Sequence, residues 1–82
     1  MKTVIRQPIT VSSVSFGKDF AEVPRRIEFD GRTINFVDMG LRYCIRRGEQ
    51  VTRLFDLSDG QSLFRLRQDS ISRDWSLLSI TS

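Results

Sequence analysis

The residues best suited to binding chemistry are four arginines in the second half of the sequence. They are Arg42, Arg46, Arg65 and Arg67. The guanidinium group is planar and always charged, and it can hold a phosphate or a carboxylate through two parallel hydrogen bonds. In the strand arrangement predicted below, all four share one face of a β-sheet, with Asp56 as the only acidic neighbour. We therefore predict that they form a site for nucleic acid or another polyanion, with Arg26 and Arg47 at its margins.

The overall charge agrees with such a site but has a plainer explanation as well. The 82 residues include 13 basic and 10 acidic ones, which gives a net charge of +3 and a pI near 9.8, and eleven of the basic residues are arginine. Anion recognition favours arginine over lysine because of its forked geometry. A modest positive charge also keeps a small protein in solution, and arginine is abundant where a genome is rich in G and C. Both explanations stay open.

No residue pattern points to catalysis. The chain has no histidine, the commonest general base near neutral pH and the commonest zinc ligand. Cys44 is the only cysteine and lacks a histidine partner, so we expect it to pack within a strand. Asp38, Asp56 and Asp59 fall in or beside turns, where aspartate caps its own backbone. Because the glycines are scattered one per turn, without a phosphate-cradling loop, we predict a protein that is not an enzyme and holds no metal or cofactor.

The elements that must position the arginines are hairpins marked by two Asp-Gly pairs. Asp-Gly supplies the positive φ angles that a tight hairpin turn requires. A two-residue turn at Asp30-Gly31 puts Phe29 opposite Arg32 and Ile27 opposite Ile34. One side of this hairpin is then apolar and carries Ile27, Phe29, Ile34 and Phe36, whereas the other side is polar. The sequence therefore predicts a half-buried antiparallel hairpin over residues 25–37.

The second Asp-Gly pair, at Asp59-Gly60, predicts a hairpin in which Phe55 lies opposite Phe64 and Leu54 opposite Arg65. The preceding strand, residues 41–46, is expected to reverse through a three-residue loop, Arg47-Gly48-Glu49. This register pairs Leu41 with Phe55, Tyr43 with Arg53 and Ile45 with Val51. The predicted apolar face of the three strands comprises Leu41, Tyr43, Ile45, Val51, Phe55, Leu57, Phe64 and Leu66. The four arginines fall on the opposite face, which depends on this register.

The two ends of the chain are also expected to form strands. Residues 2–16 alternate like one or two strands, and Pro8 indicates a sheet edge because it lacks an amide hydrogen. Residues 17–24 read as a loop with Phe20 tucked under the sheet, and Met39 is expected to fill core. A last strand is predicted over residues 75–80.

Together these segments predict one all-β domain, residues 1–82, with six or seven antiparallel strands in a meander that curls into a small barrel or a strongly twisted half-barrel. The chain has no apolar run long enough for a membrane span, no apolar signal region at its N-terminus and one cysteine. We therefore expect a cytoplasmic protein with no membrane association.

The predicted function is a binding module that uses the arginine face for nucleic acid or another polyanion. The alternative is a protein–protein interaction or self-assembly module that acts through an exposed sheet edge. A thin core and terminal strands rich in β-branched residues motivate this alternative, because unpaired edges recruit other strands. Its expected partners are an acidic protein or further copies of the same chain.

Overall fold

The computed structural model describes residues 1–16, 22–37 and 40–82. These residues form seven strands and no helix. The strands are β1 (Lys2–Phe16), β2 (Glu22–Phe29), β3 (Arg32–Asn35), β4 (Leu41–Arg47), β5 (Gln50–Ser58), β6 (Leu63–Asp69) and β7 (Trp75–Thr81). All pairings between them are antiparallel, so the predicted all-β class is confirmed. Three sequence expectations, for Phe20, Asp38 and Met39, fall outside the described residues.

The strand order in the sheet is β3-β2-β1-β7-β6-β5-β4. Each strand therefore lies beside its neighbour in sequence except at β3 and β4, and the first strand pairs with the last. The prediction that the terminal strands are edges is wrong, because β1 and β7 lie side by side in the interior of the sheet. The sheet does not close into a barrel, and its two edges are β3 and β4.

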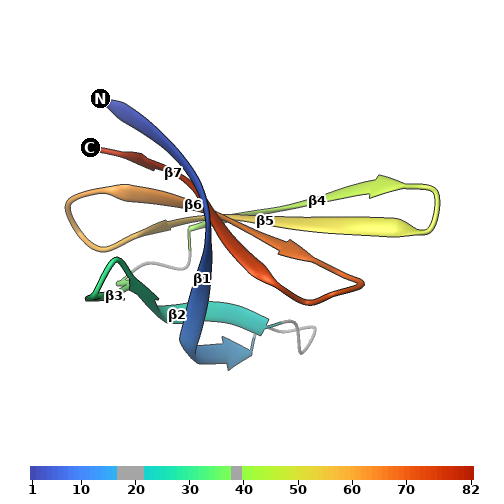
Figure 1. Cartoon of the computed structure of the whole chain (residues 1–82), viewed down its shortest axis with the longest axis horizontal. Coiled ribbons are helices and arrows are strands. Elements are labelled where there is room, and N and C mark those ends of the chain that lie inside the picture. Colours follow the sequence, from blue (N-terminus) through green and yellow to red (C-terminus); the bar gives the residue numbers. More distant parts are fainter. Residues whose placement is uncertain (17–21, 38–39) are drawn as a thin grey trace.

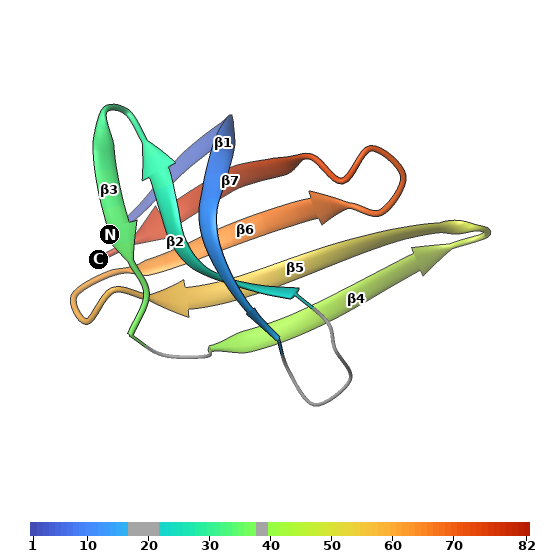
Figure 2. The same cartoon turned by 90° about the horizontal axis from the view of Figure 1, so that it is seen from below.

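The long strand β1 divides the sheet into two layers. Its first half, through Ile9, pairs with β7, and its second half, from Thr10, pairs with β2. Figures 1 and 2 show β1 bending so that β2 and β3 cross over the strands β4 to β7. Pro8 lies in the first half, at a level where β7 is the only described neighbour of β1, so its missing amide hydrogen is tolerated.

The core lies between these two layers. One side of it is supplied by β2, β3 and the residue that follows them, and the other by β5, β6 and β7. The buried apolar side chains are Val23, Ile27, Phe29, Ile34, Phe36, Phe55, Leu57, Phe64, Leu66 and Leu77. The rings of Phe36 and Phe64 meet edge to face across the two layers, with centroids 5.6 Å apart. The described residues contain no helix that is long and apolar enough to span a membrane.

The first hairpin has the predicted register. Phe29 pairs with Arg32 and Ile27 with Ile34, and the turn residues Asp30 and Gly31 have φ angles of 52° and 73°. Positive φ at both central positions defines a type I′ turn, whose twist matches that of the flanking strands. The apolar side of the hairpin is buried, so turn chemistry and side-chain alternation gave the same correct answer.

The second hairpin is displaced by two residues from the predicted register. Phe55 pairs with Leu66 and Leu57 with Phe64, so the loop spans residues 59–62. This displacement is caused by the Asp59 side chain, whose Oδ1 accepts hydrogen bonds from the backbone N–H groups of Gln61 and Ser62. A shift of two residues keeps every side chain on its predicted face, because alternation has a period of two. The burial of Phe55 and Phe64 is therefore confirmed although their pairing is not.

The register between β4 and β5 differs from the prediction by one residue. Tyr43 pairs with Leu54 and Arg47 with Gln50, so the chain reverses through the two residues Gly48 and Glu49. Gly48 has a φ angle of 61°, as the first central position of a type II′ turn requires. A shift of one residue moves each side chain of β4 to the other face. The prediction that Leu41, Tyr43 and Ile45 face the core is therefore wrong.

Candidate anion-binding face

The candidate site lies on the side of strands β4 to β7 that points away from the core, which we call the outer face. The opposite side, which carries Phe55 and Leu66, is the inner face. Directly paired residues share a face, so the register assigns each side chain of these strands to one side or the other. The outer face carries Leu41, Tyr43, Ile45, Arg47, Gln50, Thr52, Leu54, Asp56, Ser58, Leu63, Arg65, Arg67 and Asp69.

The four arginines predicted to form one site are divided between the two faces. Arg65 and Arg67 lie on the outer face, opposite Asp56 and Leu54. Arg42 pairs with Phe55 and Arg46 with Val51, which places both on the inner face. The shared face assumed for all four is therefore wrong, and its physical reason is the one-residue shift of β4. Of the two arginines expected at the margins, Arg47 lies on the outer face beside Gln50.

Arg26, the other marginal arginine, belongs to the second layer of the molecule. It lies on β2 opposite Asn35, and its Nε donates a hydrogen bond of 3.1 Å to the Ser12 hydroxyl. This position separates it from the outer face of β4 to β7. It is therefore not part of the candidate site.

Arg65 is bound to a carboxylate within the site. Its Nε and Nη2 atoms donate hydrogen bonds of 2.8 and 2.9 Å to the two oxygens of Asp56. These bonds lower the pKa of Asp56, which burial alone would raise, and a hydrogen bond with the Tyr43 side chain lowers it further. Since Asp56 already neutralises it, Arg65 contributes less to the binding of an external anion than an unpaired arginine would.

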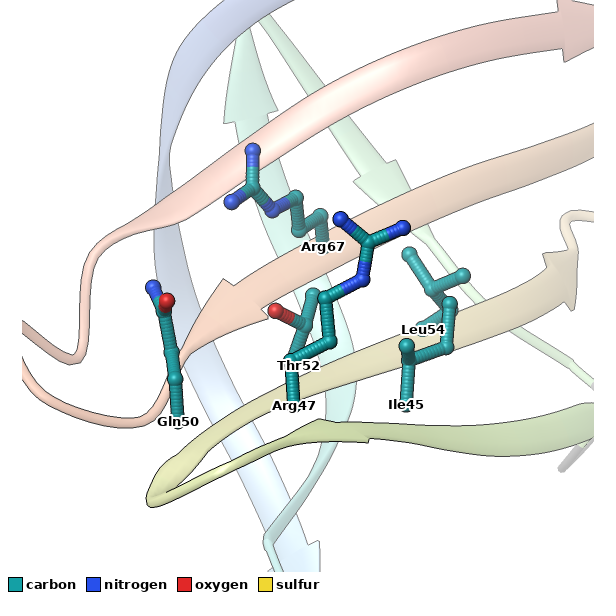
Figure 3. Close-up of a pocket in the computed structure, with 6 residues that line it drawn as sticks. All are labelled: Ile45, Arg47, Gln50, Thr52, Leu54 and Arg67. Carbon is teal, nitrogen blue, oxygen red and sulfur yellow. The ribbon is translucent and has the colours of Figure 1, made fainter.

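Arg47 and Arg67 are the exposed cations of the outer face. Figure 3 shows both side chains rising on the same side of the sheet, and Thr52 and Leu54 belong to β5, the strand between β4 and β6. They line a hollow of about 320 Å³, together with Ile45 and Gln50. Within the described part of the chain, neither guanidinium forms a hydrogen bond or a salt bridge with another residue. Both therefore have their donors available to a ligand.

A second hollow continues the site across the sheet. It has a volume of about 400 Å³ and is lined by Arg6, Arg67, Ser76 and Leu78. Arg67 thus borders both hollows. Arg6 lies where the pairing of β1 with β7 is irregular, and its φ angle is 56°. The three arginines Arg47, Arg67 and Arg6 consequently belong to β4, β6 and β1 of one continuous surface.

Sequence reasoning assigned the wrong side chains of β4 to this surface. Tyr43, assigned to the core, is 43% exposed and lies on the outer face beside Leu54. The signal that identifies this arrangement is the Gly-Glu pair at positions 48 and 49, because glycine is preferred at the first central position of a type II′ turn. Reading the reversal as two residues instead of three would have placed Tyr43, Ile45 and Arg47 correctly.

Asp59 and Asp69 stabilise turns, and Cys44 lies on an exposed strand. Asp59 caps its own turn as predicted. The hydrogen bonds that it accepts from the backbone N–H groups of Ser62 and Gln61 lower its pKa. Asp69 forms a similar turn with Ile71 and Ser72. Cys44 is exposed in β4, so the expectation that it packs within the protein is wrong.

The strand arrangement defines an all-β protein built on a seven-stranded antiparallel sheet. Comparison with known proteins adds no relative: no family model matches the chain, and neither a curated protein nor a solved structure matches it significantly.

Proposed function

We propose that the protein is a cytoplasmic, non-enzymatic module that binds a polyanion on its outer face, and that single-stranded nucleic acid is the ligand class to test first. The observation that carries the proposal is the register of β4. It brings the exposed Tyr43 and Arg47 onto the surface that already holds Leu54 and Arg67. Cations, an aromatic ring and small polar groups then share one continuous surface.

The spacing of the cations suits an extended anionic chain. Arg47, Arg67 and Arg6 lie on β4, β6 and β1, so a ligand that crosses the strands meets an arginine at every second strand. Arg47 lies at the level of Gln50 on β5 and Arg67 at the level of Leu54, so the two arginines are offset by four residues along the strands as well as by two strands across, and their backbones are about 16 Å apart. Flexible arginine side chains reach phosphates over such intervals. The bound chain is therefore expected to cross the strands diagonally.

The apolar part of the outer face favours nucleic acid over a simple polyanion. Single-stranded nucleic acid is held by backbone phosphates on basic residues and by bases stacked on exposed aromatic rings. Tyr43 supplies such a ring, and the neighbouring Leu54 and Ile45 supply apolar surface next to it. A polyanion without bases would leave this surface unused.

The experiment is a titration of a fluorescently labelled fifteen-nucleotide oligothymidine at several salt concentrations, followed by fluorescence anisotropy. For single strands, log K falls with log [salt] by about 0.7 for each phosphate neutralised. We expect a slope of about −1.4 to −2.1, for two or three arginines. Arg67→Glu and Arg47→Glu should each weaken binding strongly, and neutral Arg67→Gln should make the slope shallower by about 0.7.

The matched control is Arg32→Glu, which makes the same charge change on β3, in the other layer of the molecule. This variant should weaken binding only slightly, through the change in net charge. Absence of binding at low salt would contradict the proposal. Equal weakening by Arg32→Glu and Arg67→Glu would contradict the assignment of the site to the outer face.

A further inference from the structure

In the described sheet, the edge strand β4 has one backbone edge that no other strand pairs with, along its whole length of seven residues. All seven of its residues are exposed, and β5 is its only neighbour among the described strands. The opposite edge, β3, has four residues, and the chain directly after it bonds to β5 through Val37 N–H and the Ser58 carbonyl, 2.9 Å apart. An edge strand presents unpaired N–H and C=O groups that can pair with another extended chain. Such pairing is therefore open to β4 and largely closed to β3.

Apolar side chains follow this edge on one face. Leu41, Tyr43 and Ile45 alternate along β4 on the outer face, and Leu41 is 61% exposed. Folded proteins usually protect an edge with charged residues, bulges or a covering segment. On the outer face, β4 instead presents a row of large apolar side chains at the spacing of a strand that another strand could cover.

The charge of the molecule is concentrated at the same place. Residues 41–54, which form most of the β4–β5 hairpin, contain four arginines and one glutamate. The remaining residues contain nine basic and nine acidic side chains, so the net charge of +3 is that of this hairpin alone. Figure 1 shows the hairpin projecting from the rest of the molecule. A positive potential at a projecting edge attracts an acidic partner.

We propose that β4 pairs with an extended acidic segment of a partner protein, which adds an eighth strand to the sheet. Residues of that segment that face Leu41, Tyr43 and Ile45 are apolar. Those on its other side are acidic, because they face the row that contains Arg46. The recognised chemistry is thus an alternation of apolar and acidic residues over about seven positions, held by main-chain hydrogen bonds.

Charge distinguishes this occupant from a second copy of the same chain. Antiparallel pairing of two β4 strands centred on Cys44 sets Arg42 of one copy opposite Arg46 of the other, and like charges directly opposite are destabilising. Centring the pair on Tyr43 avoids that opposition but still gathers the arginines of both copies along one seam. An acidic strand has neither cost. It also removes the net charge of the hairpin.

The test uses a labelled seven-residue peptide with valine at odd positions, glutamate at positions 2 and 6, and threonine at position 4. This pattern reads the same in both directions, so it fits either orientation. We expect saturable binding in fluorescence anisotropy and amide chemical-shift changes centred on residues 41–47. N-methylation of the backbone nitrogens along both edges of the peptide should abolish binding, because it removes the donors on whichever edge meets β4.

Reversing the charge of Arg46 and of the peptide separates a loss of binding from a loss of folding, because a folded variant should still bind the peptide of opposite charge. Arg46→Glu should weaken binding of the glutamate peptide about tenfold, and it should strengthen binding of the same peptide with lysine in place of glutamate. Arg67→Glu is the matched control, since Arg67 lies on β6, away from the edge, and its effect on the peptide should be small. Failure of Arg67→Glu to weaken oligonucleotide binding would count against the outer-face proposal but not against this one.

Three results with the peptide would overturn the inference. They are equal binding of the N-methylated peptide, no preference of Arg46→Glu for the lysine peptide, and shifts that fall on residues 32–35 instead of 41–47. A concentration-dependent dimer in light scattering, with peptide displaced as the dimer forms, would assign the edge to a second copy and also overturn it.

Discussion

The Asp56 carboxylate and the Arg65 guanidinium form a two-pronged ion pair across β5 and β6, with N–O distances of 2.8 and 2.9 Å. Asp56 is 5% exposed, whereas the Arg65 side chain is 41% exposed. A carboxylate this buried needs a partner to stay charged. The pair therefore stabilises the outer face and holds β5 and β6 in their register.

This pair predicts a loss of stability in acid. Arg65 lowers the pKa of Asp56 in the folded state below its ordinary value of 3.8. The stabilisation is complete above the unfolded pKa and is lost as the pH falls through the folded pKa. We expect the free energy of unfolding, measured in urea, to fall below about pH 4. Asp56→Asn should remove part of this pH dependence and cost about 1–2 kcal/mol at pH 7, reduced by the exposure of Arg65.

Asp69→Asn is a suitable control for the acid titration. The pKa of Asp69 is also lowered, by the backbone N–H groups of Ser72 and Ile71, but the group lies in a solvent-exposed turn. Its substitution should leave most of the acid dependence in place. If Asp56→Asn and wild type lose stability in parallel between pH 5 and pH 2, the ion pair is not its source.

Gly40, just before β4, should not tolerate alanine. Its φ angle is 60°, and a Cβ atom at this position would overlap the backbone oxygen of Asp56. The backbone of β5 cannot move aside without breaking its pairing, so we expect Gly40→Ala to destabilise the protein by about 3 kcal/mol or more. Thermal or urea unfolding measures this loss.

Gly48→Ala provides the comparison for Gly40→Ala. Gly48 has a similar φ angle of 61°, but nothing lies within 4 Å of an added Cβ. Only the conformational cost of about 1–2 kcal/mol applies there. Equal losses in the two variants would mean that β4 and β5 do not approach each other as described.

The parts of the fold that sequence predicts well are those in which two independent signals agree. At Asp30-Gly31 the turn type and the apolar pairing of Ile27 with Ile34 require the same register. At Asp59-Gly60 the local signal was ambiguous, because the Asp59 side chain competes with the tight turn by capping a longer loop. Each side chain of β5 and β6 still lies on its predicted face, because the register error was two residues.

The candidate site was harder to predict because it depends on one residue of register in β4. Arg47-Gly48-Glu49 can reverse the chain as a two-residue or a three-residue loop, and local chemistry permits both. Side-chain alternation favoured the wrong loop, because an apolar row such as Leu41, Tyr43 and Ile45 is normally assigned to the core. That assignment fails at an edge strand whose outer face no other layer covers. Strand order, which sequence does not supply, was the missing information.

Tyr43→Ala should separate ligand binding from folding. Because Tyr43 is 43% exposed, removal of its side chain should change the free energy of unfolding by less than about 1 kcal/mol. If bases stack on it, oligonucleotide affinity should fall about 5- to 100-fold, from about 1–3 kcal/mol per stacked base. Tyr43→Phe is the control and should retain most of the affinity. An unchanged affinity for Tyr43→Ala would remove Tyr43 from the site.

The exposure of β4 can be tested against the burial of β6 with one pair of leucines. Leu66 is fully buried between Phe55 and Leu77, so Leu66→Ala should cost about 2–5 kcal/mol through lost contacts and a cavity. Leu41→Ala should cost less than about 0.5 kcal/mol, because this side chain is mostly in water. Urea unfolding of both variants measures the difference. A large loss for Leu41→Ala would mean that β4 faces the core, and the outer face would then lose the residues that define it.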